Sequence, residues 1–458
     1  MGPRLAKNQI EAFVAQHFLA HGNPLFLPLS SSLPLYILSS TCGRTAGLRT
    51  GDGMPACLAI EFQRRVCDTR SASPLPAGGD RPTARPAACA TASFPQRHRH
   101  KRLHMKPSAA LFSILVAVFL FVLAFAAGPL RVTPAHAAAP PPDNGAVIVM
   151  YHRFGETDYP STSIRLDQFE AHIAELTSGR YTVLPLPEII AAFAEGRVLP
   201  ERTVAITVDD AYLSVYAEAW PRLRAAGLPF TVFAATRPLD LDLPGYMSWA
   251  QLREMVASGL VTVGNHGVTH AHMVRQSAAE ARAEIAEATR RIETELGQAP
   301  SLFAYPYGEY SLALRNLVAA AGFAAAFGQH SGAAARIADR LSLPRYPLNE
   351  TYGDLDRFRL VANSLPLPVT DITPADPLLD PAGNPPPYGF TVVEGITGLR
   401  ALGCFARGAK ATIERLGERR IEVRFSQPFP PGRARVNCTM PGPDGRWRWL
   451  GIQFYVLP

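Results

Sequence analysis

The run Ala205-Ile206-Thr207-Val208-Asp209-Asp210 leads a hydrophobic strand directly into two adjacent carboxylates. A second apolar run, Val261-Thr262-Val263-Gly264-Asn265, ends in His266, and His270 follows four positions later. In folds that alternate strands and helices, chemistry collects at the carboxyl ends of the strands. The two runs therefore supply one acid and two imidazoles for a divalent metal, with a second acid beside them. This combination favours a metal-assisted hydrolase.

Strand-like and helix-like segments alternate on both sides of these two runs. Strands are expected at 147–151, 204–208, 230–234, 261–263, 302–305 and 324–327. Helices are expected at 166–176, 189–194, 214–226, 249–257, 277–296 and 311–321. Regular alternation of this kind predicts an α/β fold with a parallel sheet or barrel.

The C-terminal part of the chain has a different pattern. Residues 363–387 are Pro-rich and unpatterned, which predicts a linker, and residues 388–458 contain period-two segments between Gly/Pro turns. We therefore expect a small β-rich accessory region there. Its last strand carries four aromatic residues, Trp447, Trp449, Phe454 and Tyr455. They could stack on sugars, but the period of two favours packing of alternate members into a core.

Residues 1–104 carry the basic charge of the chain. They hold 13 Lys/Arg and 5 Asp/Glu, a net +8, so the formal charge of +7 leaves −1 for the rest. The main body therefore shows no bias toward polyanions, and we expect no nucleic-acid partner. Residues 1–104 also show no sustained period, and we expect a disordered or spurious N-terminal extension.

Residues 105–137 have the anatomy of a secretory signal peptide. Lys106 follows Met105, residues 109–127 form an apolar run, and Ala135-His136-Ala137 is a small-x-small cleavage site. We expect Met105 to be the true start and the mature protein to be periplasmic or extracellular. The alternative is a membrane anchor, since a run of 19 residues is just long enough to span a bilayer. Outside the cytoplasm Cys404 and Cys438 could pair, which the sequence leaves open.

Two imidazoles and one carboxylate form a suitable ligand set for Zn²⁺, which lowers the pKa of a bound water and polarises a carbonyl. The second carboxylate can then accept the proton of the attacking water. Each feature alone is weak, because adjacent aspartates more often form turns and H-x-x-x-H histidines more often lie on a surface or in a core. His152 is equally consistent with a core or a pocket position. His272 could compete for the metal, but a position that faces solvent or lies beside the metal ligands is favoured.

At these motifs the chain resembles the polysaccharide deacetylases, carbohydrate esterase family 4, which include the chitooligosaccharide deacetylases of nodulation. Thr207-Val208-Asp209-Asp210-Ala211 matches T-F-D-D-G, and His266-Gly267-Val268-Thr269-His270 matches H-[ST]-x-x-H. Ala304-Tyr305-Pro306-Tyr307 partly matches R-x-P-Y. The resemblance implies a distorted (β/α) barrel over residues 145–362 that hydrolyses N-acetyl groups on an amino-sugar glycan with a zinc-type metal.

The resemblance also implies a role for each matched residue. Asp209 would be the general base, and Asp210, His266 and His270 would be the metal ligands. The backbone N–H of Tyr307 would form part of the oxyanion hole.

Several positions depart from the family pattern. Ala211 stands in place of Gly, Gly267 in place of Ser or Thr, and Ala304 in place of the arginine that orients the catalytic aspartate. Arg345 is a candidate for the missing cation. His330 is the candidate for the late histidine that furnishes the family's general acid, and a structural role for either residue is equally consistent.

The leading hypothesis is an exported, metal-dependent deacetylase of an N-acetylated glycan. The alternatives are a catalytically impaired glycan-binding barrel and an amidase that acts on a non-sugar amide. Retention of all three ligands and of Asp209 favours an enzyme. Substrate choice resides in loops, so the sequence does not separate chitin-like oligomers, peptidoglycan and exopolysaccharide, and it leaves the oligomeric state open.

Overall fold

The computed structural model of this chain describes residues 144–458. The N-terminal extension expected at 1–104 and the signal peptide expected at 105–137 lie outside the described residues. The described residues all belong to one compact unit. Within this described part, each helix is too short or too polar to cross a membrane.

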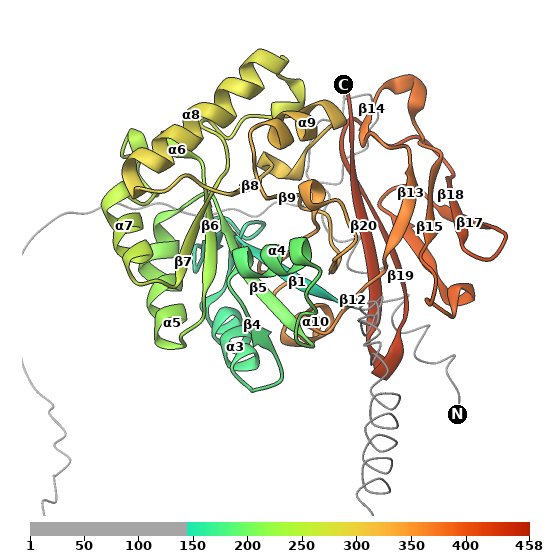
Figure 1. The fold of residues 1–458 in the computed structure, drawn as a ribbon, viewed down its shortest axis with the longest axis horizontal. Helices are drawn as coiled ribbons and strands as arrows, with labels where there is room; N and C mark the ends of the chain where they lie inside the picture. The colour runs from blue at the N-terminus through green and yellow to red at the C-terminus, as the bar shows by residue number, and fades with distance from the viewer. Residues whose placement is uncertain (1–143) are drawn as a thin grey trace, which may run out of the picture. The chain divides into compact units, whose positions relative to one another are not determined.

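A sheet of nine strands forms the centre of the first domain. Its curl can be followed in Figure 1. Its main path is β10-β1-β5-β6-β7-β8-β9, with β11 beside β1 and β4 beside β5. The pairings are parallel except that of β10 with β1. The strands are β1 (Gly145–Tyr151), β4 (Thr182–Val183), β5 (Thr203–Asp209), β6 (Phe230–Ala234), β7 (Val261–Asn265), β8 (Leu302–Ala304), β9 (Ala325–Phe327), β10 (Ala334–Ala335) and β11 (Tyr346–Pro347). A short parallel pair, β2 (Arg153–Phe154) and β3 (Ser163–Ile164), lies apart from it.

Helices connect the parallel strands and surround the sheet (Figure 1). They are α3 (Leu166–Leu176), α4 (Leu186–Glu195), α5 (Trp220–Ala225), α6 (Thr236–Asp240), α7 (Trp249–Ala257), α8 (Ala278–Leu296), α9 (Leu312–Ala320) and α10 (Leu355–Ala362). The helix expected at 214–226 begins with a π-helical turn, Val215–Ala219, before α5. The predicted fold class is confirmed, because the sheet is a curled half-barrel with helices around it.

Strand β5 brings the two aspartates to the edge of the sheet. All seven of its residues are buried. Val204, Ile206 and Val208 pack into the core beneath the helices, whereas Ala205 packs on the other face. Because side chains alternate along a strand, Asp209 shares the face of Ala205 inside the half-barrel. Burial on both faces explains why the run is continuously apolar.

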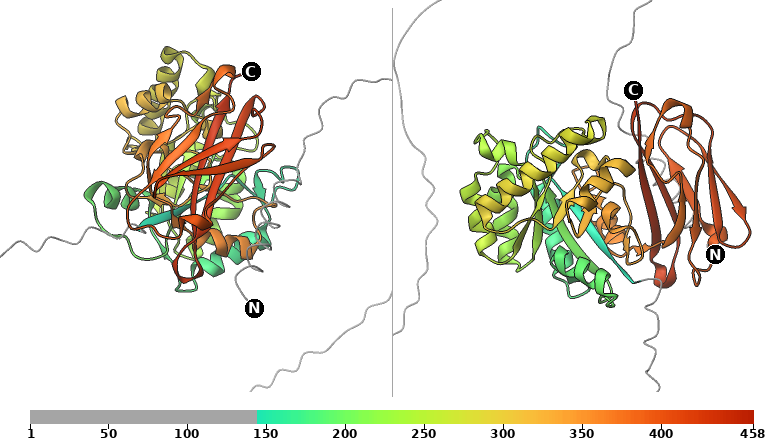
Figure 2. Two further views of the ribbon diagram at one scale, coloured as in Figure 1. Left: turned by 90° about the vertical axis from the view of Figure 1, so that its right-hand side faces the viewer. Right: turned by 45° about the horizontal axis from the view of Figure 1, so that its top comes forward.

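The C-terminal residues form a two-layered β-sandwich, seen in both views of Figure 2. One sheet has the order β12-β20-β19-β16 with β14 beside β20, and the other has the order β13-β15-β18-β17. The first sheet contains β12 (Leu365–Pro366), β14 (Leu378–Leu379), β16 (Gly403–Ala406), β19 (Gly432–Pro441) and β20 (Trp447–Val456). The second contains β13 (Val369–Thr373), β15 (Tyr388–Val392), β17 (Ala411–Leu416) and β18 (Arg420–Phe425).

The segment 363–387 was expected to be a linker, and this prediction is wrong. It contributes β12 and β14, which pair with β20, and β13, which pairs with β15. These strands are two to five residues long and take their register from partners distant in sequence. The local sequence therefore shows no alternating pattern for these strands, and the prolines between them resemble those of a linker.

Strand β20 is covered on both of its faces. One face packs into the sandwich core through Leu450, Ile452, Phe454 and Val456. The opposite face turns to the barrel, where the ring of Trp449 packs edge-on against Tyr346 at 5.4 Å. A Cβ atom at Gly451 would lie only 2.0 Å from the carbonyl oxygen of Ser331, so the two backbones are in close contact. Phe454 is thus in a core, as the period of two predicts.

Cys404 of β16 faces Cys438 of β19, and the two form a disulfide with their Cα atoms 4.1 Å apart. The pairing that the sequence left open is therefore present in the sandwich.

Candidate metal centre and catalytic site

One carboxylate and two imidazoles meet at the carboxyl edge of the sheet. Asp210 follows β5, and His266 and His270 follow β7, two strands away across β6. The Oδ1 atom of Asp210 lies 3.5 Å from Nε2 of His266 and 3.2 Å from Nε2 of His270. The three candidate ligand atoms lie within 4.8 Å of one another. This spacing allows one cation to contact all three.

The hydrogen bonding of His266 tests whether these residues fit a metal. Its Nδ1 atom lies 2.7 Å from the carbonyl oxygen of Ala304, which requires the ring proton on Nδ1. Its Nε2 atom is buried and has no hydrogen-bond partner among the described residues. Burial lowers the pKa of His266 to about 4, so the ring stays neutral and Nε2 keeps a free lone pair. The donor set therefore fits a zinc-type cation.

Asp209 is held by a buried arginine. The guanidinium of Arg345 donates to both carboxylate oxygens, at 2.6 and 2.8 Å, and its Nε donates to the Gly328 carbonyl at 2.9 Å. Burial opposes ionisation of Asp209, but the charge and the hydrogen bonds of Arg345 outweigh it and hold the pKa of Asp209 below its usual range. Arg345, which precedes β11, thus occupies the place of the cation that Ala304 does not supply.

A third imidazole, His152, also lies at this edge. It follows β1, and its Nε2 atom is 3.9 Å from Oδ2 of Asp209. Its side chain is 15% exposed, so it borders the site instead of being enclosed in the core. From sequence a core position and a pocket position were equally consistent for His152, and the structure places it beside Asp209.

The predicted general acid His330 follows the carboxyl end of β9, but it does not line the pocket that contains Asp210. His330 is buried and lines a separate cavity with Tyr388, Trp449 and Gly451. The loop that carries it packs beneath β20, where Gly451 lies against Ser331. The general-acid role expected for His330 therefore stays a prediction, and a second candidate for it is His152, which lies beside Asp209.

Tyr307 borders the metal centre from the loop after β8. Its ring lies 4.4 Å from that of His270, and it lines the same pocket as Asp210. Its backbone is left-handed, with φ 59° and ψ 5°. The N–H groups of Gly308 and Glu309 donate the backbone hydrogen bonds of this turn, whereas the N–H of Tyr307 does not. The Tyr307 N–H therefore takes no part in the hydrogen bonds of the turn.

Backbone strain concentrates at the same place. Eight non-glycine residues in the described chain have a positive φ, and half of them, Asp210, Ala211, His270 and Tyr307, belong to the predicted motifs. Each such conformation costs an L residue about 1–2 kcal/mol. Strained residues of this kind persist where surrounding contacts impose them, and they cluster at functional sites.

The loop between the two histidines is fixed from within the barrel. Glu284 of α8 accepts hydrogen bonds from the backbone N–H groups of Val268 and Thr269, at 2.7 and 2.9 Å, and from the Thr269 hydroxyl at 2.7 Å. Asn265 accepts from the N–H of Gly267 at 2.8 Å. Sequence reasoning missed Glu284, because it is one of several glutamates on a charged helix.

The metal centre opens into a pocket lined by both apolar and polar side chains. It is lined by Asp210, Tyr212, Ala235, Arg237, Pro238, Leu241, Leu243, Tyr246, Thr269, His270 and Tyr307. The rings of Tyr212 and Tyr246 lie 4.9 Å apart on this wall. Aromatic faces beside polar groups suit a ligand with both apolar and hydroxylated surfaces, such as a sugar.

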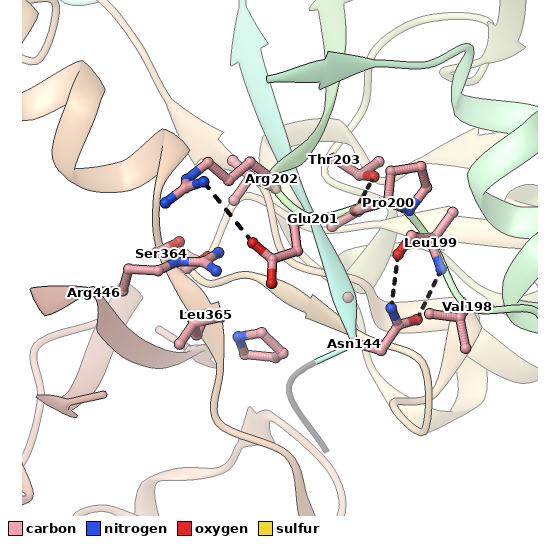
Figure 3. Close-up of a pocket in the computed structure, with 14 residues that line it drawn as sticks. Asn144, Val198, Leu199, Pro200, Glu201, Arg202, Thr203, Ser364, Leu365 and Arg446 are labelled. Carbon is pink, nitrogen blue, oxygen red and sulfur yellow. Dashed lines mark hydrogen bonds and ion pairs between the residues drawn. The ribbon is translucent and has the colours of Figure 1, made fainter. Parts of the chain in front are cut away.

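A second pocket lies at the opposite, amino edge of the sheet (Figure 3). There Asn144 exchanges two hydrogen bonds with the backbone of Leu199, and the Thr203 hydroxyl donates to the Pro200 carbonyl. These polar groups are satisfied by one another, in contrast to Nε2 of His266. The chemistry therefore belongs to the carboxyl edge.

Comparison with known proteins agrees with this site. The sequence profile of the polysaccharide deacetylase family matches residues 196–326. A putative polysaccharide deacetylase of Bacillus subtilis, YxkH, is 24% identical over 189 residues, which cover 41% of this chain and 66% of the relative. The poly-β-1,6-N-acetyl-D-glucosamine N-deacetylase of Escherichia coli K12 is 26% identical over 216 residues, covering 38% of this chain and 32% of the relative. The chain carries a polysaccharide deacetylase domain of the NodB type.

Solved structures of deacetylases also align with the chain. The Streptococcus pyogenes deacetylase PplD, solved with acetate, has a TM-score of 0.45 and 19% identity and covers 48% of this chain and 98% of its own. IcaB from Ammonifex degensii has a TM-score of 0.44 and 25% identity over similar shares. The chain spans about two thirds of the Bacillus relative and one third of the Escherichia coli relative.

Proposed function

We propose that this protein is an exported, metal-dependent hydrolase that removes N-acetyl groups from an amino-sugar polysaccharide or oligosaccharide. The observation that carries the proposal is the unpartnered, buried Nε2 atom of His266 beside Asp210 and His270. The polysaccharide deacetylase domain supports the reaction class, and similarity to the Escherichia coli poly-β-1,6-N-acetyl-D-glucosamine N-deacetylase supports an N-acetylglucosamine polymer as substrate.

The chemistry divides among the residues at the edge of the sheet. A bound divalent cation, most simply Zn²⁺, would supply a water of lowered pKa and polarise the acetyl carbonyl. Asp209, kept ionised by Arg345, would take the proton of the attacking water. The Tyr307 N–H would donate to the oxygen on which negative charge develops. His152 would deliver a proton to the departing amine, because it is the imidazole beside Asp209.

Export is the second part of the proposal. The signal-peptide anatomy of residues 105–137 supports it, with a membrane anchor as the alternative. The Cys404–Cys438 disulfide is a further support, since such bonds persist in oxidising compartments. Sequencing the N-terminus of the exported protein tests this part. A start near Ala138 is expected, and a start within residues 1–104 would contradict it.

Acetate release tests the activity most directly. The full chain is incubated with β-1,6-linked N-acetylglucosamine oligomers, with chitin oligomers and with peptidoglycan, each with and without a chelator. We expect acetate from at least one glycan, its loss with chelator, and its return with added zinc. Binding of a glycan without acetate release would favour the catalytically impaired glycan-binding barrel. Release from simple non-sugar amides alone would favour the amidase.

A further inference from the structure

The side chain of Gln453 reaches from the sandwich to the active-site edge of the barrel. Its Nε2 donates to the Tyr307 carbonyl oxygen at 3.0 Å, and its Oε1 accepts from Nε of Arg435 at 2.9 Å. Gln453 is 2% exposed. Because Arg435 is a donor only, it fixes which end of the amide carries the oxygen. The amide nitrogen must therefore face Tyr307.

A second set of contacts encloses the same loop. Glu309 is buried, and its carboxylate lies 2.7 Å from Nδ1 of His272 and 3.7 Å from Nε of Arg433 on β19. The ring of His272 stacks on that of Tyr307, with centroids 4.1 Å apart and planes 12° apart. Arg433 lies 5.6 Å from the centroid of the Tyr307 ring. Strand β19 therefore contributes to holding the loop that carries Tyr307.

These contacts matter because the backbone conformation of Tyr307 is strained. Its left-handed φ and ψ are disfavoured for an L residue, so contacts outside the turn must maintain them. These two angles join the peptide plane of the N–H to that of the carbonyl. A hydrogen bond that fixes the carbonyl therefore also restrains the direction of the N–H.

We propose that the C-terminal sandwich is a working part of the active site and that Gln453 is a positioning residue. It fixes the Tyr307 peptide and so aims the Tyr307 N–H at the site where the acetyl oxygen becomes charged. Arg435 orients the amide of Gln453 for this purpose. The catalytic meaning of this assignment rests on the proposed deacetylase function, whereas its structural meaning does not.

Two isosteric variants separate positioning from folding. Gln453→Met removes both hydrogen bonds at similar volume. Gln453→Glu keeps an oxygen for Arg435, and so keeps the sandwich intact, but presents no donor to Tyr307. The matched control is Tyr455→Phe, two residues along the same face of β20, which removes only the hydrogen bond from Arg275 to the Tyr455 hydroxyl.

Three quantities are measured on the full chain: kcat and KM for acetate release from a β-1,6-linked N-acetylglucosamine pentamer, zinc content, and hydrogen exchange of peptides covering 304–310. Loss of a direct oxyanion donor lowers kcat about 10²–10³-fold, so loss of its support should lower kcat about tenfold. We expect this loss in both Gln453 variants, with KM and zinc content unchanged and with faster exchange at 304–310. Tyr455→Phe should match the wild type in all three.

Each other outcome is decisive. Normal kcat in both Gln453 variants would overturn the proposal, and so would an equal loss in Tyr455→Phe. If the wild type releases no acetate, the deacetylase function fails, and hydrogen exchange alone then decides the positioning role. Accelerated exchange confined to 304–310 supports that role, and unchanged exchange in both variants overturns it.

Discussion

Two loops meet at the metal centre, and they are held from different sides. The loop at 266–270 is fixed by Glu284, which lies 16 residues from Val268 on the barrel's own helix α8. The loop at 305–309 is fixed by Gln453, which lies 146 residues from Tyr307 in the sandwich. The first support is local in sequence, whereas the second requires the C-terminal sheet to be folded and docked.

This difference separates two properties of one site. In the proposed site, metal affinity would depend on His266 and His270, and therefore on contacts that form within the barrel. Orientation of the Tyr307 N–H depends on the added domain. A change on one side should leave the other side intact, so each loop serves as the control for the other.

The largest effect is expected where neither loop is touched. Asp209→Asn removes the proton acceptor but preserves both loops and the three candidate ligands. Turnover should fall on the order of 10²-fold or more, while zinc content and exchange at 304–310 remain those of the wild type. Steady-state kinetics of acetate release measures this. Near-normal turnover would refute the role of Asp209 and promote the binding-protein alternative.

The next effect tests the barrel side. Glu284→Ala removes three hydrogen bonds to the loop between the histidines. Loss of groups that orient metal ligands typically weakens metal binding about 10–100-fold, and we expect the lower end here. Competition with a fluorescent zinc chelator measures the affinity. Glu284→Gln should restore most of it, because one amide oxygen can still accept from both N–H groups. Equal zinc affinity in the alanine variant would show that Glu284 does not support the metal ligands.

A smaller effect is expected from the sandwich side. Gly451→Ala places a methyl group against the Ser331 carbonyl and should shift β20 away from the barrel. Such overpacking costs about 1–3 kcal/mol of unfolding free energy. Chemical denaturation measures this cost, and exchange at 304–310 should accelerate while zinc affinity stays constant. A fall in zinc affinity would show that the two sides are not separable.

The smallest effect concerns one bond of the barrel side. Thr269→Val removes the hydroxyl bond to Glu284 but keeps both backbone bonds. An exposed hydrogen bond contributes about 0.5–1.5 kcal/mol, so zinc affinity should fall only a few-fold. The same chelator competition decides it. A loss as large as that of Glu284→Ala would mean that the backbone bonds contribute little.

The local part of the site could be predicted from sequence. Asp209, Asp210 and His266 each end an apolar run, and the carboxyl ends of parallel strands share one edge. His152 ends such a run too, but a single histidine after a strand has no partner in the local sequence. It gains a role only when β1 pairs with β5 and brings it beside Asp209.

The remaining parts depend on contacts distant in sequence. Arg345 could be proposed as the missing cation, but only the pairing of β11 with β1 brings it to Asp209. The linker prediction for 363–387 failed because pairing with β15 and β20 sets the register of its short strands. The role of Gln453 depends on how the C-terminal sheet packs against the barrel. A polar residue on a strand of period two does not reveal that packing from sequence.

Zinc content decides whether His266 and His270 hold a metal. Elemental analysis is made of the wild type, His266→Ala, His270→Ala and, as a matched control from the other loop's support, Gln453→Met. We expect one zinc per chain in the wild type and in Gln453→Met, and loss of the metal in both histidine variants. Full zinc content in both histidine variants would contradict it.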